Sequence, residues 1–248
     1  MPDLSFAQWL LAIVAAIGIG VAKAGFAGVS MVYVVIFAFL FGARESSGIV
    51  LTLLLLGDLA AIRLFRQHAR WDYIRRMLPP ACVGIVLGTL LMGRLDESAF
   101  RPTIGTIILV LTVLHLVRMA RPGWLGSVPH ARWFAWTMGI LAGITSMLAN
   151  ASGPIIALYT LAVGLPKLEF VGTNAWFFMI INALKVPFSI SLGLIHANTL
   201  LLNVALAPAI ALGVWGGRWA THRVSQRTFE TLLLAFAAIA ALRLIGVV

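Results

Sequence analysis

Hydrophobic positions form long continuous runs along this chain, and short polar stretches separate the runs. Ten apolar segments are predicted, at 6–22, 26–41, 47–65, 77–93, 99–117, 133–149, 152–164, 168–192, 197–217 and 228–247. Apolar and polar residues do not alternate within them, as they would in a membrane β-barrel. Because only helices and closed barrels satisfy the backbone inside a bilayer, the pattern predicts an all-α polytopic membrane protein.

Composition supports this class. Apolar residues make up 61% of the 248-residue chain and charged residues 10%, whereas soluble domains have about 45–50% and about 25%. An ordinary cytosolic globule and a disordered chain are therefore excluded. The first residues carry no basic stretch and lead into further spans, so we expect no cleaved signal peptide.

Basic residues are distributed unevenly among the gaps between segments. Of the 18 Lys and Arg residues, thirteen lie in odd-numbered gaps, four lie in even-numbered gaps or in the last segment, and Lys185 lies within a segment. Since cytoplasmic loops are enriched in Lys and Arg, we predict that both termini face outward. The net charge of +10 is then an orientation signal, and no basic domain is present to bind nucleic acid.

The two halves of the chain share a spaced pattern. A proline, two glycines, an arginine and a phenylalanine occur between Pro79 and Phe100, and the same residues recur 129 positions later between Pro208 and Phe229. The two copies lie five segments apart, because they begin in the fourth and the ninth segment. Because five is odd, the second copy would be inverted relative to the first, as in many secondary transporters.

This pattern predicts two five-segment repeats, at 1–121 and 130–248, joined by a linker at 122–129 within a basic cytoplasmic loop. The alternative is a single bundle whose glycines only allow helices to pack closely. That alternative explains the glycines but not their constant spacing. The sequence leaves the oligomeric state open between a monomer and a homodimer.

Each half opens with an apolar stretch that small and polar residues interrupt, at 18–28 and at 143–154. The segment after the second interruption, 152–164, would span only about 20 Å, which is less than the bilayer core of about 30 Å. Paired interrupted segments mark the binding site in many transporters. We therefore expect two broken or re-entrant hairpins that meet near the midplane, the alternative being tight turns between ordinary spans.

The hairpin residues suit an anion. Ser152 is a favourable N-cap, Gly153 allows close approach of the backbone, and a helix that begins there directs free N–H groups and a partial positive charge at the ligand. Asn150 adds amide donors. The corresponding residues of the first half are Lys23, Gly25 and Gly28.

Asp58 lies near the middle of segment 47–65, where a charged carboxylate costs about 2.5–3.5 kcal/mol on insertion scales. It therefore requires a partner, a cavity or a proton. The repeat pattern aligns Asp58 with Asn182. Two roles remain open, namely a structural hydrogen bond between helices and the coupling of transport to protons.

Segment 168–192 carries further polar residues. Asn174 and Lys185 are separated by three helical turns and therefore share a face of the helix. Asn182 lies one turn from Lys185. This arrangement predicts a polar cavity beside the helix. The alternative for Lys185 is extension of its side chain to the outer membrane interface.

Other chemistry is poorly represented. Cys82 is the single cysteine, the five histidines show no metal-ligand spacing, and Asp58 is the one acid of eight that lies near the middle of an apolar segment. Hydrolases and lipid transferases of membranes need paired carboxylates, a Ser/His pair or a metal motif. We therefore expect neither an enzyme nor a cofactor or metal site.

These motifs resemble the TauE/SafE (sulfite exporter) family of bacterial membrane permeases over nearly the whole chain. The resemblance rests on the small-residue hairpin of each half, on the recurring Pro-x4-Gly-x3-Gly pattern, and on the motifs Ser152-Gly153-Pro154, Gly172-Thr173-Asn174 and Asn182-x2-Lys185-x-Pro187. It implies a multi-pass permease of the bacterial cytoplasmic (inner) membrane. It also implies export of sulfite, sulfonates or related anions.

We therefore expect a secondary transporter for a small sulfur oxyanion or sulfonate, with its site in the lipid-embedded centre and with Asp58 coupling transport to protons. A passive anion channel of similar architecture is the alternative. The candidate substrate-binding residues are Lys23, Gly25, Gly28, Asn150, Ser152, Gly153, Asn174, Asn182 and Lys185.

Overall fold

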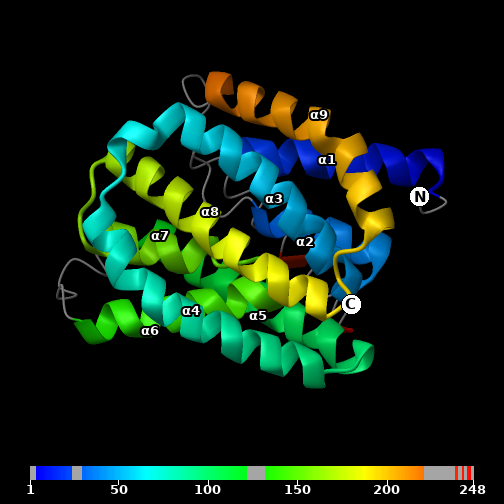
Figure 1. Cartoon of the computed structure of the whole chain (residues 1–248), viewed down its shortest axis with the longest axis horizontal. Helices are drawn as coiled ribbons and strands as arrows, with labels where there is room; N and C mark the ends of the chain where they lie inside the picture. Colours follow the sequence, from blue (N-terminus) through cyan, green and yellow to red (C-terminus); the bar gives the residue numbers. More distant parts are fainter. Residues whose placement is uncertain are drawn as a thin grey trace.

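A computed structural model describes residues 4–23, 30–121 and 132–220, together with 238–239, 242 and 245–246. Most of these residues are helical, and none of them forms a strand (Figure 1). The helices are α1 (Phe6–Lys23), α2 (Ser30–Phe41), α3 (Ala43–Phe65), the 3-10 turn η1 (Arg66–His68), α4 (Trp71–Arg94), α5 (Glu97–Ala120), α6 (Arg132–Ala149), α7 (Gly153–Ala162), α8 (Lys167–Ser191) and α9 (Ala197–Ala220).

The first nine predicted segments each overlap one of these helices, which confirms the all-α class. Most of the tenth, 228–247, lies outside the described residues. The main difference is that helices extend past the apolar runs, as α4 does when it begins at Trp71 rather than at 77. The added turns carry the exposed residues Arg75 and Arg76, because backbone hydrogen bonding continues where the side chains are no longer apolar.

Helix boundaries have local causes. Gly42 adopts a φ of 85° between α2 and α3, a conformation that glycine reaches without steric cost. Asp96 caps α5 by accepting a hydrogen bond from the Ala99 N–H at 2.9 Å. Asn150, with a φ of 50°, ends α6 in the left-handed conformation, which asparagine tolerates better than most residues.

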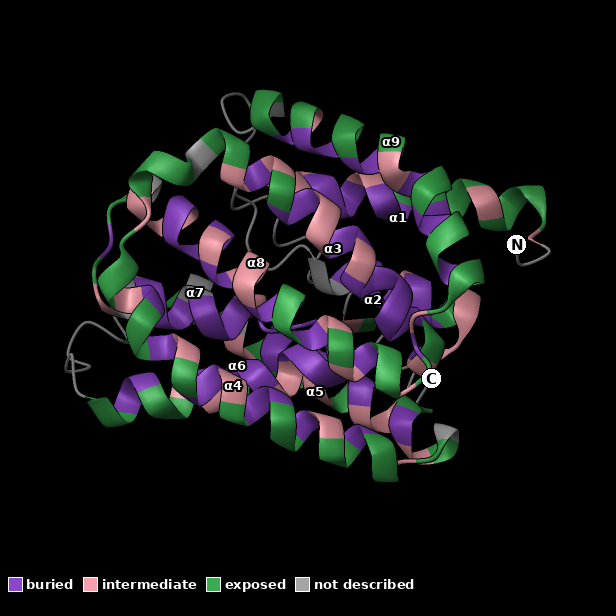
Figure 2. Ribbon diagram, in the orientation of Figure 1, coloured by how far each residue is buried: buried purple, intermediate pink, exposed green. Residues whose placement is uncertain are grey.

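Four of the described helices are long and apolar enough to cross a membrane, judged by length and composition: Phe6–Lys23, Ala43–Leu64, Trp71–Arg94 and Ala197–Trp219. Buried residues lie toward the middle of the bundle, and exposed residues lie on its outer helices (Figure 2). Many exposed side chains are large and apolar, including Leu90, Val204 and Trp215. Such a surface suits lipid rather than water.

Two helix pairs are packed through glycine. A Cβ atom on Gly84 of α4 would lie 2.2 Å from a carbonyl oxygen of α6, and one on Gly213 of α9 would lie 2.0 Å from a carbonyl oxygen of α1. From the opposite sides, Gly143 of α6 and Gly20 of α1 have equally little space. Backbones therefore touch directly, as is common where helices associate in membranes.

Helices α3 and α8 lie between these two pairs (Figure 1). They pack against each other, α3 also contacts α9, and α8 also contacts α4. Helix α6 ends inside the bundle and the ten-residue α7 begins there. The centre of the molecule is therefore formed by α3, α8 and the ends of α1 and α6.

Candidate functional site

The charged side chains of α3 and α8 are buried at this centre. Asp58 of α3 is 0% exposed and Lys185 of α8 is 1% exposed. Lys185 is thus enclosed in the protein rather than extended to a membrane interface. Buried charges of this kind need partners, because desolvation in a bilayer is costly.

Asp58 has two partners, one on each oxygen. The Lys23 ammonium, at the end of α1, donates to Oδ1 at 2.5 Å, and the Asn182 amide of α8 donates to Oδ2 at 2.7 Å. The Lys23 ammonium also lies 4.8 Å from the centre of the Phe178 ring, a favourable cation–π geometry. The carboxylate is therefore fully compensated.

Lys185 is held differently. Its ammonium donates to the Ser146 hydroxyl at 3.1 Å, to Asn150 Oδ1 at 2.6 Å and to Asn182 Oδ1 at 3.5 Å. All three acceptors are neutral. Among the described residues Lys185 forms no ion pair, so its charge has no direct counter-ion.

Asn150 connects this lysine to α3. Its amide nitrogen donates to the Ser47 carbonyl at 2.9 Å, which leaves its oxygen directed at Lys185. The Ser47 hydroxyl in turn donates to the Met147 carbonyl at 3.5 Å. The left-handed conformation of Asn150 thus places its side-chain amide between Ser47, which accepts from the nitrogen, and Lys185, which donates to the oxygen.

These contacts form one continuous hydrogen-bonded group, here called the central polar cluster, which consists of Lys23, Ser47, Asp58, Ser146, Asn150, Asn182 and Lys185. When its three titratable groups are ionised, two lysines and one aspartate leave one uncompensated positive charge. Such a site can receive an anion in a dry environment. In the part of the chain that the structure describes, no group of three or more His, Cys, Asp or Glu residues could hold a metal ion.

The structure thus brings together five of the predicted functional residues: Lys23, Asp58, Asn150, Asn182 and Lys185. Ser152 and Gly153 follow Asn150 directly, and the Ser152 carbonyl accepts the Ile156 N–H at 3.1 Å as α7 begins. The predicted residues Gly25 and Gly28 lie outside the described residues.

Asn174 lies apart from the cluster. It lines a cavity of about 10 Å³ together with Tyr73, Tyr159 and Phe177. Its Oδ1 atom is buried and has no hydrogen-bond partner among the described residues. Eleven residues separate Asn174 from Lys185, which corresponds to about 16 Å along the helix.

Sequence reasoning missed Ser47 and Ser146 of the cluster. A serine in an apolar helix is common and gives little signal, because its hydroxyl can bond to its own backbone. It also missed Asn203 of α9, which is 2% exposed and whose amide oxygen and nitrogen have no hydrogen-bond partner in the described part of the chain. An asparagine within an apolar segment was a usable signal for Asn203.

Comparison with known proteins identifies the family. The model of the family described as sulfite exporter TauE/SafE matches residues 10–244. The chain belongs to this family. A search of curated proteins and a search of solved structures found no match.

Membership of the TauE/SafE family confirms the resemblance noted in the sequence. It also agrees with a membrane transporter as the class of function, and with the prediction that the chain is not an enzyme. The helices that are long and apolar enough to cross a membrane fit the same class.

Proposed function

We propose that this TauE/SafE protein is a secondary transporter that exports a small sulfur-containing anion across the bacterial cytoplasmic membrane. The observation that carries the proposal is the uncompensated charge of Lys185, buried among neutral acceptors. A monoanion such as hydrogen sulfite or an organosulfonate would neutralise the cluster. Charge-assisted hydrogen bonds of this kind are stronger than neutral ones.

The anion would lie beside Lys185 and near the start of α7. Asn150 orients the lysine, and the free N–H groups at the beginning of α7, near Ser152 and Gly153, would face the ligand. From the other hairpin, Lys23 would contribute charge when Asp58 is protonated. Gly25 and Gly28 would provide the corresponding close approach of the backbone.

We propose that the two halves, 1–121 and 130–248, are inverted repeats joined at 122–129. One supporting contact is that between Asp58 and Asn182, which the repeat alignment treats as equivalent, because equivalent residues touch each other only next to a two-fold axis. A second is that α4 packs on α6 as α9 packs on α1, with glycine at the contact in both. Both termini would face outward, as the distribution of basic residues predicts.

Asp58 would couple the anion to a proton. Protonation of Asp58 would remove the counter-charge of Lys23 and so raise the positive charge of the cluster by one. Proton and anion would therefore favour each other's binding, a coupling that is reciprocal by thermodynamic necessity. A carried pair of one proton and one monoanion is neutral, so the direction of transport would follow the combined gradients of the two, and export would require an outward anion gradient larger than any inward proton gradient.

Flux into proteoliposomes tests the function. Purified protein would be supplied with sulfite, sulfate, thiosulfate and methanesulfonate, each with and without a pH gradient. We expect uptake of sulfite or methanesulfonate. When the outside is made more acidic than the inside, we expect the anion to accumulate above its external concentration. Flux that only equilibrates the anion would indicate a channel, and absence of flux for all four anions in folded protein would refute the proposal.

The coupling role of Asp58 has its own test. The double variant Lys23→Gln/Asp58→Asn removes the titratable carboxyl without leaving a buried charge unpaired. We expect it to carry the anion but to lose the dependence of flux on the pH gradient, with Asp72→Asn on the exposed first turn of α4 as the control. Retained pH dependence would leave Asp58 with a structural role only.

A further inference from the structure

The bundle has two ends that are built from matching parts. At one end, here called the α3 end, α3 begins and the connection 192–196 between α8 and α9 lies beside it. At the other, called the α8 end, α8 begins and the connection 66–70 between α3 and α4 lies beside it. In each case a connection covers the first turn of a central helix.

At each end a glutamate of the central helix faces a basic side chain of the connection, an arginine at one end and a histidine, charged only when protonated, at the other. At the α3 end, Glu45 Oε1 lies 3.7 Å from His196 Nε2. At the α8 end, Glu169 Oε2 lies 3.0 Å from Arg70 Nη1. These two pairs face solvent in part, with side chains between 30% and 54% exposed.

The two carboxylates occupy equivalent positions. Glu45 and Glu169 are 124 residues apart, the same spacing as Asp58 and Asn182, which hydrogen-bond each other at the centre. Each glutamate precedes its central residue by thirteen positions, or about 20 Å of helix. Because α3 and α8 begin at opposite ends, the two pairs lie on opposite sides of the central polar cluster.

Backbone contacts hold each connection in place. At the α3 end, a Cβ atom on Gly48 would lie 2.0 Å from the Leu194 carbonyl oxygen, so the connection rests directly on α3. At the α8 end, the Arg70 N–H donates to the Thr173 hydroxyl at 3.0 Å. Each connection therefore shields one end of the central helices, and each of these side-chain pairs fastens it.

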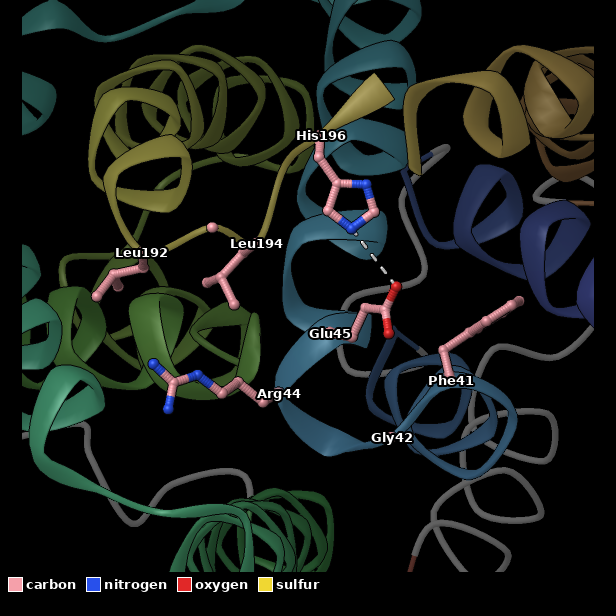
Figure 3. Close-up of a pocket in the computed structure, with 8 residues that line it drawn as sticks. Phe41, Gly42, Arg44, Glu45, Leu192, Leu194 and His196 are labelled. Atoms are coloured by element: carbon pink, nitrogen blue, oxygen red, sulfur yellow. Dashed lines mark ion pairs between the residues drawn. The ribbon is translucent and has the colours of Figure 1, made fainter. Parts of the chain in front are cut away.

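The α3 end also carries a larger cavity. It is an open hollow of about 430 Å³, lined by residues that include Phe41, Arg44, Glu45, Leu192 and His196. Figure 3 shows Arg44 on one side and the Glu45–His196 pair on the other. The Arg44 guanidinium donates one N–H to the Leu95 carbonyl at 3.1 Å. This is one of the five N–H donors that an arginine carries. The cavity beside Asn174, which adjoins Thr173 of the α8 end, is only about 10 Å³.

We infer that the Glu45–His196 and Arg70–Glu169 pairs are the two gates of alternating access, and that the cavity at Arg44 is a vestibule that receives the oxyanion at the α3 end. This rests on the proposed transport function. Side-chain pairs that are partly exposed to solvent contribute little to stability, so either gate can open in each cycle. The gates differ in kind, since arginine stays charged and histidine is charged only when protonated.

Accessibility of the centre to a thiol reagent tests this inference. In a Cys82→Ser background, which has no other cysteine, Ser146→Cys places one thiol beside Lys185. A membrane-impermeant methanethiosulfonate that carries a sulfonate group is added to one side of sealed vesicles at a time. We expect Glu45→Gln to increase the labelling rate several-fold from one side, and Glu169→Gln to increase it from the opposite side.

Controls separate gating from unfolding. Asp72→Asn removes an exposed carboxylate of α4 and should leave both rates unchanged. The exchange Arg70→Glu/Glu169→Arg should restore slow labelling, because it rebuilds the pair with reversed charge. Labelling that rises from the same side in both glutamate variants, or from neither side, would overturn the inference.

This experiment needs no transport. Opposite-sided labelling in a protein that carries none of the tested anions would keep the gates and reject the proposed substrates. Normal transport with unaltered labelling would keep the proposed substrates and reject the gates.

The vestibule has its own test. Arg44→Gln should reduce sulfite flux several-fold at low sulfite from the α3 side and leave flux at saturating sulfite unchanged. An equal loss at all concentrations would reject the vestibule.

Discussion

Lys23 and Lys185 are the two lysines of the central polar cluster, the first partly buried and the second fully buried, and their surroundings differ. Lys23 donates to a carboxylate, Asp58, at 2.5 Å and lies over the Phe178 ring. Lys185 donates to one hydroxyl and two amide oxygens and has no counter-ion among the described residues. One lysine belongs to a closed ion pair, and the other is solvated by neutral dipoles.

The difference assigns the two lysines different tasks. A buried ion pair loses much of its stability if one partner is removed, because a single charge then remains without compensation. A buried ammonium held by neutral groups gains most when an anion arrives. Lys23 and Asp58 should therefore matter first for stability, and Lys185 should matter first for anion binding.

The largest expected effect follows from breaking the ion pair. Asp58→Asn leaves the Lys23 charge unpaired and should lower stability by about 3–5 kcal/mol. Lys23→Gln/Asp58→Asn removes both charges and should recover most of that loss. Thermal unfolding of the purified variants in detergent checks this. A single variant as stable as the original chain, or a double variant no better than the single one, would contradict it.

The next effect concerns binding. Lys185→Met retains an apolar chain of similar length and leaves no carboxylate unpaired, so the fold should persist. A hydrogen bond to a charged group contributes about 1.5–3 kcal/mol, and its loss should weaken anion affinity about 10- to 100-fold. Calorimetric titration with sulfite and methanesulfonate measures this, with Arg63→Met as an exposed control. Unchanged affinity would show that Lys185 does not face the anion.

A third variant changes charge without changing size. Asn182→Asp places a second carboxyl beside Asp58, whose Oδ2 accepts the Asn182 amide at 2.7 Å, so the two carboxyls share a proton until the pH is high enough to ionise both. If the excess positive charge of the cluster selects the anion, affinity in the same titration should fall about tenfold, or about 1.4 kcal/mol, once the pH is raised far enough to ionise both carboxyls. Asn182→Ser, which removes the amide and adds no charge, should have a smaller effect. Equal losses in both variants would mean that the amide matters rather than the charge.

The helices were predictable from the sequence because the requirement is local. A run of apolar residues between polar ends can bury its backbone in lipid only as a helix, and this placed nine segments close to their helices. Asp58 and Lys185 were predictable for the same reason, since a charge in such a run is costly and needs an explanation.

The partners of these charges were not predictable in this way. Lys23 and Asp58 are 35 residues apart, and Ser47 and Asn150 are 103 apart. Those contacts depend on where α6 ends and on how α3 crosses α8, which no local periodicity encodes. Asn174 shows the same limit, because it shares a helical face with Lys185 but lies three turns away, beside α4 and α7.

The smallest expected effect separates the two asparagines Asn150 and Asn174, both of which the sequence assigned to the substrate site. Asn150 holds Lys185 directly, so Asn150→Gly, which keeps the positive φ accessible, should weaken anion affinity about tenfold, or about 1.4 kcal/mol. Asn174→Leu, about 16 Å along the helix from Lys185, should change it less than about twofold.

The Asn174 substitution should also be harmless to the fold. It removes a buried acceptor that has no partner, and an unsatisfied buried polar group costs about 1–3 kcal/mol, so thermal stability should stay equal or rise slightly. Titration and thermal unfolding of both variants under one set of conditions decide the matter. If Asn174→Leu lowers affinity as much as Asn150→Gly does, the binding site extends along α8 to the cavity beside Tyr73 and Tyr159, and the uncompensated charge of Lys185 is not its centre.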